Sequence, residues 1–186
     1  VPEAARWLAS AIEAAYGAWP APVRESVPIN ATVPAVGPAA VAGIVAPFPG
    51  CDTVKVKVAE PGQTLADDVA RVAEVRAVMG PRARIRLDAN GNWSLAEAAE
   101  ALERLGRYDL DYVEQPCASV RELAALRRSL AGRGIRIRIA ADESIRKAED
   151  PLRVAREEAA DLVVVKVAPL GGVARTLEIV EACGLP

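Results

Sequence analysis

Hydrophobic residues alternate with polar ones in some segments of the chain and recur at helical spacing in others. Period-two alternation or a compact apolar segment predicts a strand, and a spacing of three to four residues predicts an amphipathic helix. The predicted strands are 28–33, 54–58, 84–88, 111–114, 136–142 and 162–166. Because helices are predicted between them, the pattern indicates parallel strands joined by right-handed crossovers.

The segments between the predicted strands have the start and stop signals of helices. Two capping boxes, in which a serine and a glutamate satisfy each other's backbone N–H groups, open two of them. These boxes are Ser94 with Glu97 and Ser119 with Glu122. Thr64 is predicted to cap the helix that follows 54–58, and Pro151 to occupy the first turn of a later helix. Gly171-Gly172 is predicted to form a tight turn before the last helix.

Periodicity alone fits a doubly wound sheet and a (β/α)₈ barrel equally well, because both consist of alternating strands and helices. In a barrel, the predicted strands would form a partial structure with about six of the eight strands. Residues 2–18 have a helical pattern with Leu8 and Ile12 on one face, and a Pro-containing linker follows. We therefore expect a terminal helix and linker over 1–27 and one α/β domain over 28–186.

Composition argues against several classes of protein. Hydrophobic residues make up 52% of the chain, so a disordered chain is not expected. The formal charge of −2 gives no basic footprint for nucleic acid, and no apolar run reaches the length of a membrane span. Cys51, Cys117 and Cys183 are widely spaced, and we expect them to be reduced, structural thiols of a cytosolic protein.

The chain contains no histidine. This absence excludes Ser-His-Asp and Cys-His catalysis, histidine general bases and His-ligated zinc within these residues. A metal site in this chain would therefore use carboxylates, which favour Mg²⁺ or Mn²⁺.

Charged residues end four consecutive predicted strands: Asp88, Glu114, Asp142 and Lys166. In parallel α/β folds, the carboxyl ends of the strands form the catalytic face. Any one of these residues could merely shape a turn or face solvent, but that explanation would have to hold on four strands. Three converging carboxylates predict a divalent cation, which would act as a Lewis acid on a substrate carboxylate when the α-proton leaves.

Lys55 and Lys57 lie two residues apart on one strand, so their side chains point to the same face. They could face water at the edge of a sheet, where lysines oppose aggregation. If they point into the site, a lysine beside another lysine and a metal should have its pKa lowered toward that of a general base. Lys166 could act on the opposite face of the same carbon. It could also form a Schiff base in a metal-free aldolase.

Five motifs resemble the muconate lactonizing enzyme subgroup of the enolase superfamily, in the order and spacing of that family. They are Lys55-Val56-Lys57, Asp88-Ala89-Asn90, Glu114-Gln115-Pro116, Ala141-Asp142-Glu143-Ser144 and Val165-Lys166. The resemblance covers 28–186 and implies a (β/α)₈ barrel domain. It also implies that 1–27 is the last helix and linker of a capping domain, and that two further barrel strands follow residue 186 in the family.

The same resemblance implies roles for individual residues. Asp88, Glu114 and Asp142 would bind Mg²⁺, and Lys57 would be the general base. Lys166 would stabilise the intermediate by its charge, Lys55 would hold the substrate carboxylate and lower the pKa of Lys57, and Asn90 would be a nearby hydrogen-bond donor.

Within the subgroup, the chain is most similar to the dehydratases of menaquinone biosynthesis. The implied reaction is a syn elimination of water from a cyclohexadiene carboxylate, so the expected partner is a small carboxylate and neither nucleic acid nor a membrane. Racemases of N-acylamino acids and epimerases of dipeptides share these lysines and carboxylates and remain an alternative. A barrel fragment without catalysis is the alternative from another class, and the oligomeric state stays open.

Overall fold

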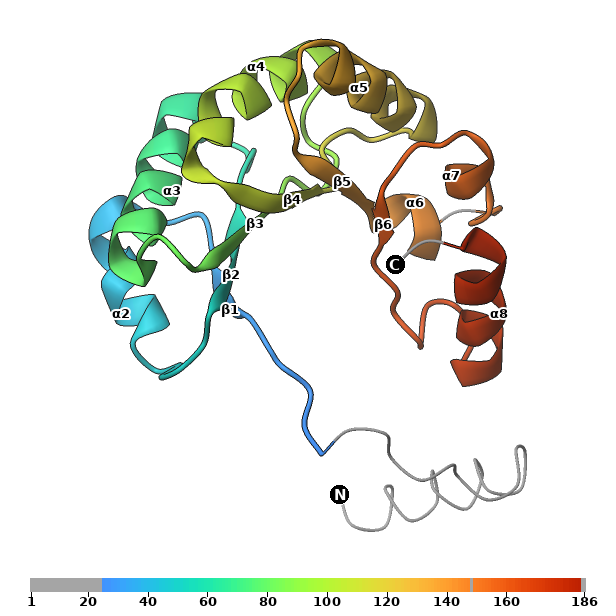
Figure 1. Ribbon diagram of the computed structural model, residues 1–186, viewed down its shortest axis with the longest axis horizontal. Coiled ribbons are helices and arrows are strands. Elements are labelled where there is room, and N and C mark those ends of the chain that lie inside the picture. Colours follow the sequence, from blue (N-terminus) through green and yellow to red (C-terminus); the bar gives the residue numbers. More distant parts are fainter. Residues whose placement is uncertain (1–24, 148, 185–186) are drawn as a thin grey trace.

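The computed structural model describes residues 25–147 and 149–184. Six parallel strands form one curved sheet, in which each strand pairs with the next one along the chain. The helices lie on the convex side of the sheet, and its concave side faces inward (Figure 1). A doubly wound sheet would reverse its strand order at a switch point. The consecutive order therefore identifies the fold as part of a (β/α) barrel and confirms the partial-barrel prediction.

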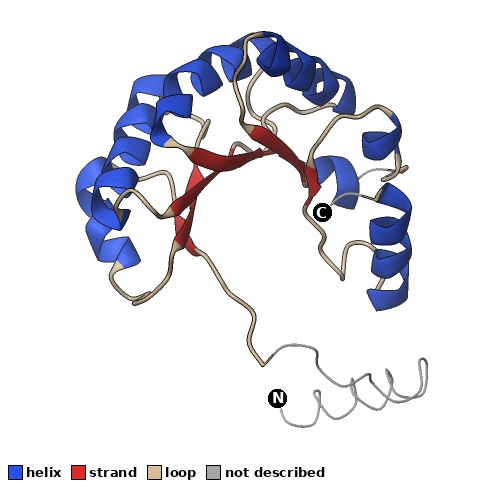
Figure 2. Ribbon diagram, viewed as in Figure 1, coloured by secondary structure: helices blue, strands red, loops and turns tan. Residues whose placement is uncertain are grey.

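The strands and helices alternate along the whole described chain (Figure 2). The strands are β1 (Ala31–Val33), β2 (Thr53–Lys57), β3 (Arg84–Asp88), β4 (Leu110–Glu114), β5 (Arg138–Ala141) and β6 (Leu162–Val163). The helices are η1 (Pro38–Ala40), α2 (Val41–Val45), α3 (Leu65–Met79), α4 (Leu95–Leu105), η2 (Gly106–Tyr108), α5 (Val120–Gly132), α6 (Glu143–Arg146), α7 (Arg153–Arg156) and α8 (Val173–Cys183). No helix among the described residues is both long and apolar enough to cross a membrane.

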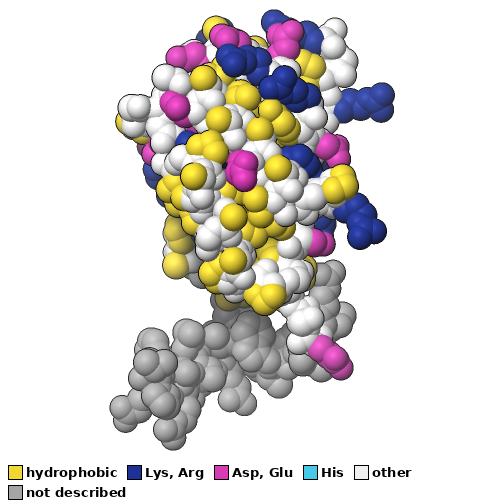
Figure 3. Space-filling view, turned by 90° about the vertical axis from the view of Figure 1, so that its left-hand side faces the viewer, with side chains coloured by type: hydrophobic (Ala, Val, Ile, Leu, Met, Phe, Trp, Pro, Cys, Tyr) yellow, Lys and Arg dark blue, Asp and Glu magenta, His cyan; other side chains and the backbone are white. Residues whose placement is uncertain are grey.

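The core lies between the sheet and the helices. Valine, leucine and isoleucine side chains on the outer face of the sheet are fully buried, among them Val54, Val56, Ile85, Leu87, Val113 and Ile139. Because successive strand residues point to opposite faces, the charged residues that alternate with them point to the concave side. The outer surface over α2 and α3 mixes hydrophobic and charged side chains (Figure 3).

Local start signals were good predictors of the helices. Both predicted capping boxes form, with Ser94 and Ser119 each accepting from the backbone of its glutamate. Thr64 caps α3 as predicted and also forms a capping box, with Asp67 in the position of the glutamate. These contacts satisfy N–H groups that a helix cannot satisfy by itself.

Several elements differ from their predictions: β1 and β5 are shorter than predicted, η1, α2 and η2 were not predicted, and three further differences lie after β5. The strand predicted at 162–166 ends at Val163, because its partner β5 ends at Ala141 and the ladder cannot continue. The helix predicted to start with Pro151 begins at Arg153 and has only four residues. The short helix α6 directly after Asp142 was not predicted. The helix predicted over 2–18 lies outside the described residues.

Candidate active site

The register of the sheet brings the predicted site residues into one layer. Lys57 pairs with Asp88, and Asp88 with Glu114, across three neighbouring strands. All three end their strands, and Asp142 directly follows β5. Parallel pairing thus collects at one end of the barrel the residues that are far apart in sequence.

The three carboxylates are buried and paired with lysines. Asp88, Glu114 and Asp142 are each 1% exposed. The Nζ atom of Lys55 lies 3.0 Å from Oδ2 of Asp88 and 3.4 Å from Oε1 of Glu114, and that of Lys57 lies 2.7 Å from Oδ2 of Asp88. Lys166 lies beyond the end of β6 and not on a strand as predicted, and its Nζ is 2.6 Å from Oδ2 of Asp142. The lysines therefore point into the site and not to water at a sheet edge.

The charges of the cluster shift the pKa values of its members. Burial raises the pKa of Glu114, the nearby Asp88 carboxylate raises it further, and Lys55 opposes this rise. Asp88 is also desolvated, but hydrogen bonds from Lys57 and Lys55 bring its pKa below the ordinary value. Burial lowers the pKa of Lys55, but the charges of Glu114 and Asp88 outweigh burial and raise it.

As the side chains stand, the described residues contain no group of three histidine, cysteine, aspartate or glutamate side chains arranged to hold a metal ion. Ammonium groups lie against the carboxylate oxygens instead. Two observations nevertheless fit a cation. Burial and the neighbouring Asp88 carboxylate raise the pKa of Glu114, and within the described residues Oε2 of Glu143 is buried without a hydrogen-bond partner. A hard divalent cation prefers carboxylate oxygens, and one bound at Glu114 would offset its desolvation and the repulsion from Asp88.

Asn90 connects the base predicted on β2 with the loop after β5. Its Oδ1 accepts from Nζ of Lys57 at 2.6 Å, and its Nδ2 is 3.4 Å from Oε1 of Glu143. Asn90 has a left-handed backbone (φ 48°), and its own N–H donates to Oδ1 of Asp88 at 3.2 Å. This turn holds the amide beside Lys57, where Asn90 accepts the hydrogen bond, whereas the predicted role of a donor is seen only toward Glu143.

Gln115 is a site residue whose role the sequence did not reveal. Its side chain is fully buried and makes four hydrogen bonds. Oε1 accepts from the backbone N–H groups of Asp142 (3.0 Å) and Ser144 (3.1 Å). Nε2 donates to Oγ of Ser144 (2.7 Å) and to the carbonyl of Cys117 (2.9 Å). The amide thus ties the end of β4 to the loop that positions Asp142.

Arg146 is a second such residue. Its Nε lies 3.0 Å from Oδ1 of Asp142, and its Nη2 lies 2.6 Å from Oε1 of Glu143. The spacing of four residues from Asp142 would have indicated this contact if a helix had been predicted there.

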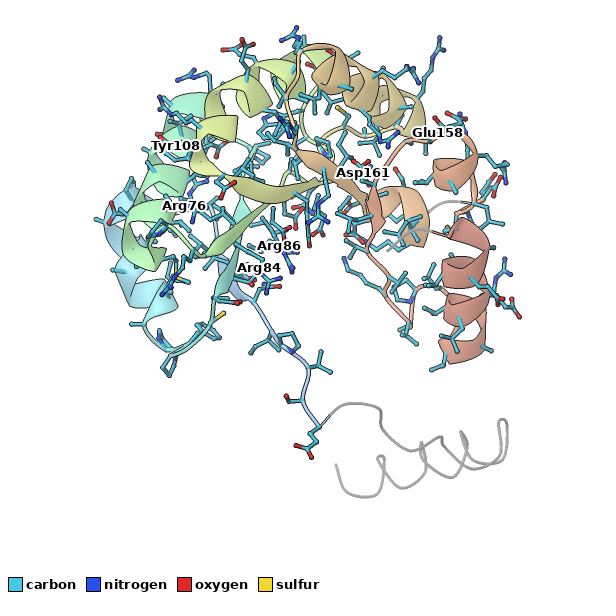
Figure 4. The ribbon with its side chains drawn as sticks, in the orientation of Figure 1. Arg76, Arg84, Arg86, Tyr108, Glu158 and Asp161 are labelled. Atoms are coloured by element: carbon cyan, nitrogen blue, oxygen red, sulfur yellow. The ribbon has the colours of Figure 1, made fainter. Side chains whose placement is uncertain are left out.

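Arginines occupy the other end of the sheet. Arg86 and Arg138 both pair with Asp111, the first with Nε 2.9 Å from Oδ2, and Arg86 also lies over the ring of Tyr112. Arg84 and Arg86 lie on β3 (Figure 4). An aspartate at a register shift between β3 and β4 thus pairs with two of these arginines.

A cavity with a volume of about 610 Å³ lies near this face. Asn90, Gln115, Glu143 and Ser144 line it, together with exposed residues such as Lys147 and Arg153. None of the three buried carboxylates lines it. The cavity therefore borders the site and does not contain its charged centre.

Two curated proteins with similar sequences are longer than this chain. An o-succinylbenzoate synthase of Thermobifida fusca (strain YX) is 59% identical over 184 residues, which are 99% of this chain and 56% of that protein. The o-succinylbenzoate synthase of Mycolicibacterium smegmatis (strain ATCC 700084 / mc(2)155) is also 59% identical, over 100% of this chain and 56% of its own length. The chain thus spans little more than half the length of these relatives.

Solved structures and a family model agree on the fold. A dipeptide epimerase from Enterococcus faecalis V583 matches with a TM-score of 0.73 and 27% identity, over 86% of this chain and 46% of that chain. A mandelate racemase/muconate lactonizing family protein from Azoarcus sp. EbN1 matches with a TM-score of 0.74 and 30% identity, over 88% and 43%. The model of the enolase C-terminal domain-like family matches residues 43–184. The chain therefore belongs to the enolase C-terminal domain-like family.

Proposed function

We propose that the full-length protein that carries this chain is an o-succinylbenzoate synthase, a hydro-lyase of menaquinone biosynthesis. The observation that carries the proposal is the layer of Lys57, Asp88 and Glu114 on adjacent strands, with the Lys166–Asp142 pair beside it. This arrangement suits removal of a proton next to a carboxylate. Two relatives named o-succinylbenzoate synthase, each 59% identical to this chain, support dehydration as the reaction.

We assign Asp88, Glu114 and Asp142 as the ligands of a divalent cation, Mg²⁺ or alternatively Mn²⁺. When bound, the cation supplies Lewis acidity toward the substrate carboxylate and stabilises the negative charge that develops as the α-proton leaves. Membership of the family supports a divalent metal, and the all-oxygen ligand set favours Mg²⁺. Lys55 is assigned to hold the substrate carboxylate.

Lys57 moves the proton in this proposal. Its neutral Nζ takes the α-proton of the cyclohexadiene carboxylate, and the resulting ammonium donates a proton to the leaving hydroxyl. One C–H bond and one C–O bond break, a C=C bond forms, and water leaves from the same face. Asn90 orients Nζ of Lys57 through the 2.6 Å contact, and the ammonium of Lys166 stabilises the electron-rich ring by its charge.

We propose the domain boundaries of the sequence prediction for the whole protein. Residues 1–27 are assigned to the terminal helix and linker of a capping domain, and 28–186 to the barrel domain. The assignment requires a protein longer than this chain, and the curated relatives are longer. We also place the enzyme in the cytoplasm, where Cys51, Cys117 and Cys183, which are unpaired in the structure, would stay reduced.

Replacing the general base tests the proposal. Lys57→Ala in the full-length protein is expected to lower the dehydration rate by at least 10³-fold while Mg²⁺ binding, measured by calorimetry, persists. Arg82→Ala is the matched control, because Arg82 is an exposed cation that precedes β3 and lies outside the cavity beside the carboxylates. Residual activity of Lys57→Ala within about tenfold of wild type would exclude Lys57 as the base.

A racemase or epimerase is the second candidate, because the dipeptide epimerase from Enterococcus faecalis has the same fold. Lys57 and Lys166 would then act as opposed acid and base. Incubation of an N-succinylamino acid with the full-length protein in deuterium oxide separates the two. Retained configuration counts against the second candidate, and racemisation that needs both lysines supports it. A Schiff-base aldolase is not favoured, because Lys166 pairs with Asp142 and is not desolvated in an apolar pocket.

A further inference from the structure

A buried ion pair lies between α3 and the end of β2 and has no part in the proposed chemistry. It consists of Asp68 and Arg71, which are three residues apart on α3. Their side chains are 2% and 0% exposed, and Nη1 of Arg71 lies 2.8 Å from Oδ1 of Asp68. Burial raises the pKa of Asp68 even beside this arginine, which reflects the cost of removing the pair from water. Asp68 and Arg71 also form hydrogen bonds with the main chain of neighbouring loops.

The pair holds the main chain on both sides of the turn that follows Lys57. Nη1 of Arg71 donates to the carbonyl of Lys57 at 2.7 Å, and Oδ2 of Asp68 accepts from the N–H of Ala59 at 2.9 Å. Ala59 has a left-handed backbone conformation (φ 59°), which is unfavourable for a residue with a Cβ atom. The chain therefore depends on outside contacts to keep this turn, and the ion pair supplies two.

The same guanidinium also holds the loop after β1. Nε of Arg71 donates to the carbonyl of Val36 at 2.7 Å, and Nη2 donates to Oε1 of Gln63. Nε2 of Gln63 in turn donates to the carbonyl of Ala35 at 2.8 Å. A rigid guanidinium with several donors can fix several carbonyls at once, which a lysine cannot do. The loops after β1 and β2 are thus held in one position at the end of the barrel that carries the carboxylates.

We propose that Asp68 and Arg71 are positioning residues for Lys57. They fix the main chain from which its side chain extends, and thereby the place of Nζ relative to the substrate. A misplacement of about 1 Å by a change outside the reacting groups can cost about 10²-fold in rate. The inference rests on the proposed role of Lys57 as the base.

The test replaces the whole pair in the full-length protein. D68L/R71M substitutes apolar side chains of similar length, which often preserve folding where a single replacement would leave one buried charge unpaired. We expect kcat to fall at least tenfold while KM and the Kd for Mg²⁺ stay within about threefold of wild type. Hydrogen exchange at the amide of Ala59 is expected to become faster. Should D68L/R71M not fold, R71K is measured instead, because it keeps the charge but cannot hold the carbonyls of Val36 and Lys57 at the same time.

Arg76 provides the matched control on the same helix. Its guanidinium donates to the carbonyls of Gly80 (2.9 Å), Ala83 (2.7 Å) and Tyr108 (2.8 Å), which precede the starts of β3 and β4 and so lie at the opposite end of the strands. R76M is therefore expected to lower stability and to leave kcat within about threefold of wild type.

The outcomes separate positioning from stability. A folded D68L/R71M or R71K protein with kcat within about threefold of wild type would overturn the inference, and so would an equal loss of kcat in R76M. Failure of the proposed function is read from another variant. If Lys57→Ala keeps its activity, Lys57 is not the base, whatever the pair variants show.

Discussion

At the scale of single residues, Gln115 shows how strain and hydrogen bonding combine. It has a left-handed backbone (φ 39°), an unfavourable conformation for a residue other than glycine, and its buried amide makes four hydrogen bonds. We predict that Gln115→Met weakens Mg²⁺ binding by the full-length protein about 10- to 100-fold, because the loop of Asp142 loses its support. Calorimetric titration measures this.

Ser144→Ala is the milder comparison for Gln115→Met. It removes the hydroxyl that accepts from Gln115 and keeps the two backbone bonds, including the one to the N–H of Asp142. Its effect on Mg²⁺ affinity should be smaller. Equal affinity in wild type and Gln115→Met would show that Gln115 does not support the loop.

Cys117 offers a test that needs no substrate. It is fully buried, and burial raises the pKa of its thiol to about 12. Since the thiolate is the reactive form, we predict that iodoacetamide at pH 8 leaves Cys117 unmodified in the folded protein and modifies it after unfolding in urea. Mass spectrometry of peptides reads both states. Modification of Cys117 before unfolding would contradict the buried position.

At the scale of elements, the capping box of α4 couples helix stability to pH. Hydrogen bonds from the backbone and side chain of Ser94 lower the pKa of Glu97. A lowered folded pKa means that this stabilisation is complete above the ordinary value of 4.5 and is lost as the pH falls through the lower, folded value. Ser94→Ala should cost about 1 kcal/mol at pH 7 and less below that range. Urea unfolding of wild type and Ser94→Ala at pH 7 and at pH 3 measures the difference in cost.

Glu97→Gln is the control for this pH dependence. Its amide oxygen can still accept from the N–H of Ser94, so the capping box persists without a titrating group. The free energy of unfolding of Glu97→Gln should therefore lack the pH-dependent contribution of the Glu97 carboxylate. A cost of Ser94→Ala that is the same at pH 7 and pH 3 would show that Glu97 does not titrate within the box.

Elements with local signals were predictable from sequence, and elements that depend on distant partners were not. The strand 84–88 and both serine capping boxes have their signals within a few residues. The end of β6 depends instead on where β5 stops, which no local pattern contains. The site shows the same division. Its carboxylates end predicted strands and its lysines lie on predicted strands, but Gln115 and Arg71 act on carbonyl and N–H groups that only the folded chain brings near.

At the scale of the whole molecule, the two ends of the barrel have different tasks. One end gathers Asp88, Glu114 and Asp142 with their lysines, and the other pairs Asp111 with arginines and ties α3 to the strand starts through Arg76. In barrels of this kind, residues at the carboxyl ends of strands serve catalysis and those at the opposite end serve stability. The proposed positioning pair belongs to the first end, although it lies outside the sheet.

Mg²⁺ should therefore stabilise the molecule as a whole if the carboxylate end binds it. A ligand that binds only the folded state adds about 2.7 kcal/mol at a concentration 100 times its Kd, so the Tm of the full-length protein should rise and return to its starting value with a chelator. Glu114→Gln should lose most of this shift, whereas Asp52→Asn, at an exposed position before β2, should keep it. A barrel that serves only as a folding or interaction unit predicts no shift in any of the three proteins. Differential scanning calorimetry with and without Mg²⁺ thus separates an enzyme of the proposed class from an inert barrel.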